Sequence, residues 1–251
     1  MVFVPFSDDN PRTWIRYHYL TLALIVACVL VFAWQSGLTP EGAHVAIYRF
    51  GIVPVVLWDD AALPAELAVL PAAATLLTSL FLHGSWLHLI GNMMFLWVFG
   101  DNVEDAMGHR RFIVFYLLCG TIAGLAHATS APGSEIPTVG ASGAISGVLG
   151  AYFILHPRVS VWGLLFSIIP MRLPTVIVLG SWIALDVLNA FLDEGGAGGV
   201  AWWAHIGGFA AGIVLIPFFK HAHVPLWDRQ PGARIRQPIR LRKKGGPWGR
   251  P

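Results

Sequence analysis

The hydrophobic positions of the chain form long runs instead of the short alternating patterns of a soluble fold. One run extends from Tyr17 to Gln35, and five further candidates cover residues 85–107, 111–128, 141–156, 174–193 and 202–220. A helix of about 20 apolar residues crosses the roughly 30 Å hydrocarbon core of a bilayer. The pattern therefore predicts six membrane-spanning helices, with a long outer loop, residues 36–84, between the first and the second.

Two of the six segments are less typical of a membrane span. Segment 85–107 contains several polar residues, and segment 141–156 is short and rich in glycine. At about 1.5 Å per residue the latter would form a helix about 24 Å long, so its start must lie below the membrane surface. Backbone that is not helical at that depth must face protein or water. This predicts a water-filled cavity in front of Ser142.

Composition and charge support this topology. The chain is 56% hydrophobic and 12% charged, against about 25% charged in an ordinary soluble domain. With both termini inside, fifteen of the sixteen Lys and Arg residues lie on the inner side and only Arg49 lies outside. Inner loops of membrane proteins carry an excess of positive residues. We therefore expect an all-α membrane protein with both termini cytoplasmic.

The two ends of the chain differ from the apolar domain, residues 17–221. Residues 1–16 form a short cytoplasmic tail, whose lack of transit-peptide character favours a bacterial inner (plasma) membrane over an organelle. Residues 222–251 carry eight Lys or Arg against Asp228 alone. This composition predicts a basic, disordered cytoplasmic tail that contacts anionic lipid headgroups. We expect no binding of nucleic acid.

Three groups of polar residues lie at the outer starts of segments two, four and six, which all run from outside to inside. They are His83, His88 and Asn92, then Ser142, and then His205. A serine hydroxyl becomes a nucleophile when a neighbouring base accepts its proton, which suggests a dyad of Ser142 and His205. His88 and Asn92, one helical turn apart, can both donate hydrogen bonds to an oxyanion.

The order of these motifs resembles that of the rhomboid intramembrane serine proteases. The chain contains HxxxxHxxxN from His83 to Asn92, GxSG from Gly140 to Gly143, and AHxxGxxxG from Ala204. A fourth motif, GxxxExxxG around Glu104, lies between the first two. The resemblance covers residues 17–220. It implies a six-helix bundle that cleaves single-pass transmembrane proteins in or next to their membrane helix, without a cofactor.

The resemblance also implies roles for individual residues. It makes Ser142 the nucleophile and His205 the general base, and it forms the oxyanion hole from His88, Asn92 and the backbone amide of Ser142. Gly140, Gly143, His83 and Glu104 would support this site and the bundle. Many relatives carry an aromatic residue four positions after the nucleophile, where this chain has Ser146. Asp186 could be a third catalytic member, but the family's dyad mechanism favours an interhelical hydrogen bond.

Other functions fit some of the same residues. An inactive relative would bind and escort transmembrane helices, although such relatives usually lack the serine or the histidine. A metal site formed by His83, His88 and His205 is disfavoured, because the chain has no HExxH motif and no acidic or cysteine ligand at a suitable spacing. A solute transporter would need a continuous polar path, whereas the polar groups gather in the outer half.

Overall fold

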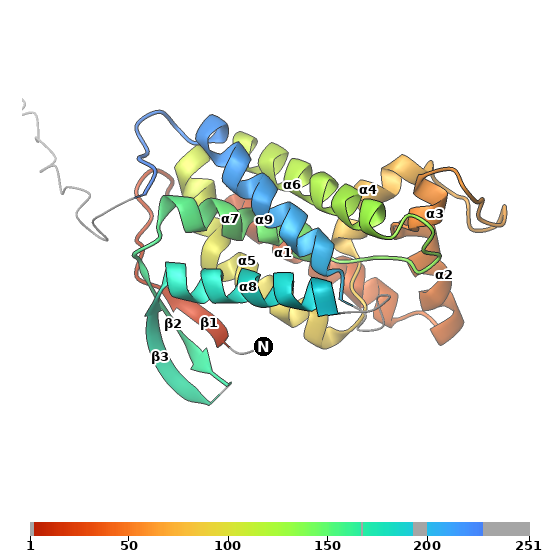
Figure 1. Cartoon of the computed structure of the whole chain (residues 1–251), viewed down its shortest axis with the longest axis horizontal. Helices are drawn as coiled ribbons and strands as arrows, with labels where there is room; N and C mark the ends of the chain where they lie inside the picture. Colours follow the sequence, from red (N-terminus) through yellow and green to blue (C-terminus); the bar gives the residue numbers. More distant parts are fainter. Residues whose placement is uncertain (1–2, 167, 193–199, 228–251) are drawn as a thin grey trace, which may run out of the picture.

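The computed structural model describes residues 3–166, 168–192 and 200–227 and shows a bundle of helices with a small sheet at one end (Figure 1). Most of the basic segment 222–251 lies outside the described residues. Six helices coincide with the six predicted segments: α1 (Tyr19–Ser36), α5 (Trp86–Met107), α6 (His109–Ser130), α7 (Ser142–Leu155), α8 (Thr175–Leu192) and α9 (Trp202–Phe219).

Within the described residues, four helices are long and apolar enough to cross a membrane: α1, α6, α8 and α9. A fifth span results if α5 is joined to the helical segment Ala72–Phe81, from which it is bent by 81°. The structure is therefore mostly helical, with four or five candidate membrane spans. The remaining helix, α7, is apolar but has only 14 residues.

The long segment between α1 and α5 contains only short helices. They are α2 (Pro40–Phe50), α3 (Pro54–Leu57), η1 (Ala72–Ala74), α4 (Thr75–Thr78) and η2 (Ser79–Phe81). Pro40 and Pro54 each begin a helix, as proline favours the first helical position. The longest of these helices, α2, has 11 residues, well short of the roughly 20 that a span needs.

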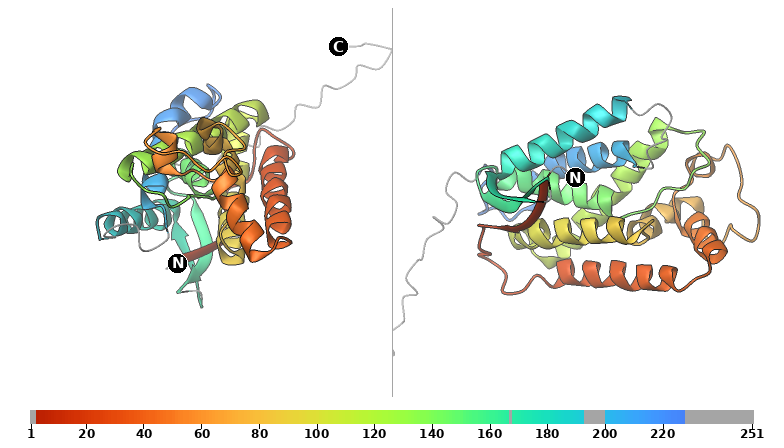
Figure 2. Two further views of the ribbon diagram at one scale, coloured as in Figure 1. Left: turned by 90° about the vertical axis from the view of Figure 1, so that its right-hand side faces the viewer. Right: turned by 90° about the horizontal axis from the view of Figure 1, so that it is seen from below.

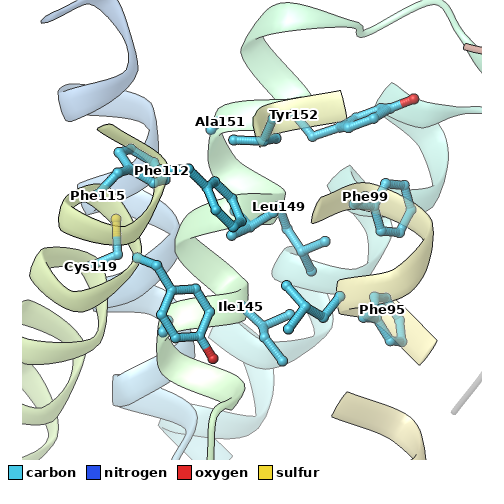
Figure 3. Close-up of a cluster of buried hydrophobic side chains, with 14 of the residues drawn as sticks. Phe95, Phe99, Phe112, Phe115, Cys119, Ile145, Leu149, Ala151 and Tyr152 are labelled. Atoms are coloured by element: carbon cyan, nitrogen blue, oxygen red, sulfur yellow. The ribbon is translucent and has the colours of Figure 1, made fainter. Parts of the chain in front are cut away.

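Helix α7 lies at the centre of the bundle. Twelve of its 14 residues are buried. Figure 3 shows Phe95 and Phe99 of α5 on one side of α7 and Phe115 and Cys119 of α6 on the other. A helix of 14 residues is only about 21 Å long. Neighbouring helices surround α7. The non-helical backbone next to α7 can therefore be buried in protein and need not face lipid.

Glycines bring α7 and α9 into backbone contact. A side chain at Gly208 would collide with the carbonyl of Gly143, and one at Gly212 would collide with the carbonyl of Gly147. The constant offset between these pairs means that the two helices are parallel and begin at the same end of the bundle. Such contacts between small residues allow the close approach that membrane helices use.

A three-stranded antiparallel sheet lies at the other end of these helices, which we call the sheet end (Figures 1 and 2). It consists of β1 (Phe3–Asp8), β2 (Ser160–Leu165) and β3 (Ile169–Pro174), in that order. The expectation of an all-α fold needs correction here, and the amino-terminal tail contributes a strand. Because β1 pairs with a strand more than 150 residues away, no local pattern indicated the pairing.

Two carboxylates of α5 attach the amino-terminal segment to the bundle at the sheet end. Asp105 accepts hydrogen bonds from three successive amides, residues 13–15, at 2.6–2.8 Å. Glu104, fully buried, accepts from the amides of Leu20 and Thr21 at 3.1 and 2.8 Å. The first amides of a helix lack intrahelical partners, and a negative charge is favourable there. Glu104 therefore caps the start of α1.

We expect Gly212→Ala to lower the free energy of unfolding by about 1–3 kcal/mol, because the added methyl group meets the backbone of α7. The matched control is Gly180→Ala on α8, where the nearest atom would be Phe153 Cε2 at 3.8 Å. This control should be neutral or stabilising by about 0.5–1 kcal/mol. Unfolding in detergent micelles measures both, and equal effects would contradict the proposed backbone contact.

The attachment of β1 should depend on pH through Asp8, which accepts hydrogen bonds from Tyr152 and Asn102. Burial, with a smaller contribution from nearby Asp101, raises the pKa of Asp8 to about 7, although the hydrogen bond from the Tyr152 hydroxyl lowers it. In the unfolded chain an aspartate titrates near pH ~3.9. The folded state therefore binds the extra proton, and its stability falls as pH rises from about 4 to 7.

Proteolysis of residues 3–8 at increasing pH tests this expectation. Cleavage of β1 should become faster between pH 5 and pH 8 in the wild type, because Asp8 becomes charged in a buried position. Asp8→Asn keeps the shape of the side chain and removes the titration, so its cleavage rate should vary less with pH. The same pH dependence in both proteins would exclude Asp8 as the cause.

Candidate active site

A cavity of about 1190 Å³ is lined mainly by residues at the end of the bundle away from the sheet, which we call the cavity end, and extends as far as Val4 of β1. This is larger than the roughly 300–1,000 Å³ of typical small-molecule pockets. Six of the residues that the sequence singled out line it: His88, Asn92, Gly140, Ser142, Gly143 and His205. They come from α5, from the turn before α7, and from α7 and α9, so the fold brings together three groups that are distant in sequence.

Ser142 is the first residue of α7, directly after a glycine turn. Gly140 has a φ of 130°, a conformation that residues with a side chain rarely adopt. Its amide donates a hydrogen bond to the carbonyl of Ser79 at 2.9 Å, which fixes the turn. The residue before the helix, Ala141, makes no side-chain hydrogen bond to the first amides of α7. The first amides of this helix, including that of Ser142, are thus available to a ligand with negative charge.

His88 and Asn92 face this glycine turn from α5. A side chain built at Gly140 would meet His88 Nε2 at 2.8 Å and Asn92 Nδ2 at 3.8 Å. Asn92 Nδ2 is buried and has no hydrogen-bond partner within the described residues. Ser85 caps α5, since its hydroxyl accepts a hydrogen bond from the His88 amide at 3.1 Å. Two side-chain nitrogens that can donate hydrogen bonds are therefore directed at the turn that precedes Ser142.

His83 lies behind His88 and is not among the residues that line the cavity. The two rings are 5.1 Å apart in an edge-on arrangement. The backbone of His83 is held by Gln35 of α1, whose amide oxygen accepts from its N–H at 3.1 Å and whose amide nitrogen donates to its carbonyl at 3.3 Å. Sequence reasoning missed Gln35. Its only signal was a polar residue at the end of an apolar run.

His205 lies in the first turn of α9, and α8 provides two of its contacts. Its Nδ1 lies 2.8 Å from Asp186 Oδ2, so the interhelical hydrogen bond expected of Asp186 is confirmed and its partner is His205. The centroid of the Trp182 ring lies 5.5 Å from that of the imidazole, and the two ring planes are at 32° to each other. Trp202 makes an edge-on contact at 6.3 Å.

The position four residues after Ser142 does not contribute an aromatic contact. The hydroxyl of Ser146 donates to the carbonyl of Ser142 at 2.7 Å. Trp182 supplies a ring beside His205 from a different helix. The sequence could not indicate this, because the contact depends on how α8 is rotated against α9.

Two further candidate residues, Glu104 and Gly143, have contacts with neighbouring helices. Glu104 is near the sheet end, where it caps α1. Gly143 packs against α6, because a Cβ placed at Gly143 would lie only 2.6 Å from Cβ of Ala123. As for a metal, no group of three or more His, Cys, Asp or Glu that could hold an ion occurs in the described part of the chain.

Comparison with known proteins places these features in a family. Residues 71–221 match the family model of the Rhomboid domain. The chain is 31% identical over 182 residues to the human "Presenilin-associated rhomboid-like protein, mitochondrial", covering 68% of this chain and 44% of that protein. It is 30% identical over 230 residues to "Rhomboid-like protease 3" of Toxoplasma gondii, covering 91% of this chain and 77% of that protein.

The relatives also bear on compartment and length. The chain spans less than half the length of the mitochondrial relatives. Relatives whose names carry a compartment are mitochondrial or, in Arabidopsis thaliana, chloroplastic. They lend no support to the expected bacterial inner membrane, whereas the apolar helices do support an integral membrane protein. Because the Rhomboid domain model covers more than half of the sequence, the chain belongs to the rhomboid family.

Proposed function

We propose that this protein is an intramembrane serine endopeptidase that cleaves single-pass transmembrane proteins in or next to their membrane helix. One observation carries the proposal: Ser142, His205, His88 and Asn92 line the same cavity although they come from three helices. A protein that only binds and escorts helices does not need a nucleophile, a base and hydrogen-bond donors around one point. The alternative of an inactive rhomboid escort is therefore less well supported.

In the proposed reaction, Ser142 Oγ attacks the carbonyl carbon of the peptide bond while its proton passes to His205 Nε2. The new C–O bond places negative charge on the carbonyl oxygen, which His88, Asn92 and the Ser142 amide stabilise. Protonated His205 then gives its proton to the leaving nitrogen as the C–N bond breaks. Water, deprotonated by His205, hydrolyses the resulting acyl-enzyme. No cofactor is required.

The proposed topology has six spans with both termini cytoplasmic. In this topology α5 and α7 are the two further spans, beside the four helices that are long and apolar enough to cross a membrane by themselves. Residues 17–221 form the protease domain, and residues 1–16 lie on the cytoplasmic side with β1. The basic segment 222–251 contacts anionic lipid on that side. This topology keeps fifteen of sixteen cations inside and places the cavity end in the outer half of the membrane.

A fluorophosphonate probe and a single-pass transmembrane substrate test the proposal. In detergent, the wild type should be labelled and should cleave the substrate, whereas Ser142→Ala should do neither because the nucleophile is gone. Ser181→Ala, the same substitution on α8, should behave as the wild type. Cleavage by Ser142→Ala at the wild-type rate would contradict the proposal. A folded wild type that binds substrate without labelling or cleavage would favour the escort function.

The proposed oxyanion hole predicts that Asn92→Ala lowers kcat by about 100- to 1,000-fold with little change in KM, since the lost hydrogen bond forms mainly in the transition state. Asn102→Ala is the matched control, because Asn102 lies near the sheet end of the same helix and donates to Asp8. Steady-state kinetics with the purified protein measure both. Equal losses in the two variants would indicate a general effect on α5 instead.

A further inference from the structure

Two residues of α8 contact His205 from the same helix face. Trp182 and Asp186 are four positions apart, so their side chains lie one above the other along the helix. Asp186 Oδ2 lies 2.8 Å from Nδ1 of His205, and the ring of Trp182 lies beside the imidazole in a tilted arrangement, with the ring centroids 5.5 Å apart. The side chains of His205 and Asp186 are 13% and 7% exposed. A hydrogen bond so shielded from water is stronger than an exposed one.

We propose that Asp186 is a positioning residue that orients the general base, so that the site works as a triad of Ser142, His205 and Asp186. This inference rests on the proposed protease function and goes beyond the dyad that the family resemblance implies. Asp186 is not among the residues that line the cavity, whereas His205 is. Asp186 therefore acts on the reaction through the imidazole and not on the substrate.

The hydrogen bond determines which nitrogen of His205 can act as the base. An ionised carboxylate only accepts hydrogen bonds, so Nδ1 must carry the hydrogen. In the neutral ring Nε2 then has the free lone pair, which is the form needed to accept the proton of Ser142. When Nε2 takes that proton, the imidazolium gains a positive charge beside the Asp186 carboxylate. The Nδ1 proton stays on the ring, and Asp186 stays ionised throughout.

Among the described contacts of His205, the hydrogen bond to Asp186 is the one that can orient the imidazole. The position four residues after the nucleophile holds Ser146, whose hydroxyl is bonded to the carbonyl of Ser142 and not to the imidazole. The described contacts of the His205 ring come from Asp186, Trp182 and Trp202. Of these, Asp186 is the one that bonds Nδ1, so the tautomer of the base depends on it.

The test compares Asp186→Asn, Asp186→Ala and Asp186→Glu in the full-length protein in detergent. Substrate cleavage gives kcat and KM, a small fluorophosphonate gives the labelling rate of Ser142, and thermal unfolding shows which variants fold. Asn can turn its amide N–H toward Nδ1 and so favour the wrong tautomer. We expect Asp186→Asn and Asp186→Ala to lower kcat and the labelling rate by about 100-fold or more, with KM within about twofold. Asp186→Glu should recover part of the activity.

The control is Asn189→Ala, which removes a polar side chain three residues further along α8 and should leave kcat unchanged. A merely structural tether would alter the unfolding temperature but not the labelling rate of the folded protein. If Asp186→Asn or Asp186→Ala folds and keeps a near wild-type kcat and labelling rate, Asp186 does not position His205. Activity of the wild type would still support the proposed protease function in that case. Absence of labelling and cleavage in the folded wild type would instead contradict the proposed function itself.

Discussion

The backbone contact between α7 and α9 is the constraint on which the rest of the structure depends. No side chain fits where Gly208 and Gly212 meet the carbonyls of α7. In a bilayer, lipid tails remove the hydrophobic drive for helices to associate, and close packing of small residues takes its place. The parallel register puts the first turns of both helices at one end. Ser142 and His205 occupy those turns, so the packing that stabilises the bundle also aligns the candidate nucleophile and base.

Polar groups at the two ends of the bundle have different hydrogen-bond partners. At the sheet end, carboxylates accept the free amides: Glu104 caps α1, and Asp105 binds residues 13–15. At the cavity end, the residue before α7, Ala141, provides no side-chain cap, and Asn92 Nδ2 has no partner in the described part of the protein. Buried polar groups normally have hydrogen-bond partners. A hydrogen-bond donor without a partner is therefore suited to stabilising a negative charge that forms only during a reaction. The unpartnered nitrogen of Asn92, close to the turn before α7, therefore suits the chemistry proposed at the cavity end.

Sequence patterns predicted the helices well because an apolar run carries its own signal, and all six segments are helical in the structure. They also singled out the residues around the cavity, since a glycine-flanked serine and a His/Asn pair are local motifs. The sheet was missed because β1 pairs with β2 across most of the chain. Gln35 and Trp182 were missed for a related reason, as each acts on another helix and its role depends on packing angles that no local pattern encodes.

The candidate nucleophile Ser142 and Asp186, the hydrogen-bond partner of the candidate base, lie on helices of very different burial. Ser142 begins α7, of which twelve of 14 residues are buried. The partner of His205 lies on α8, where 22% of the span is buried, against 44% for α6. On the α5 side, α8 makes a distant ring contact between Trp182 and Phe95 at 6.3 Å. Displacement of α8 from α9 would break the bond to His205 and leave Ser142 in place. In the proposed mechanism, orientation of His205 by Asp186 therefore requires α8 to be packed against α9, whereas the buried helix α7 places Ser142 independently of α8.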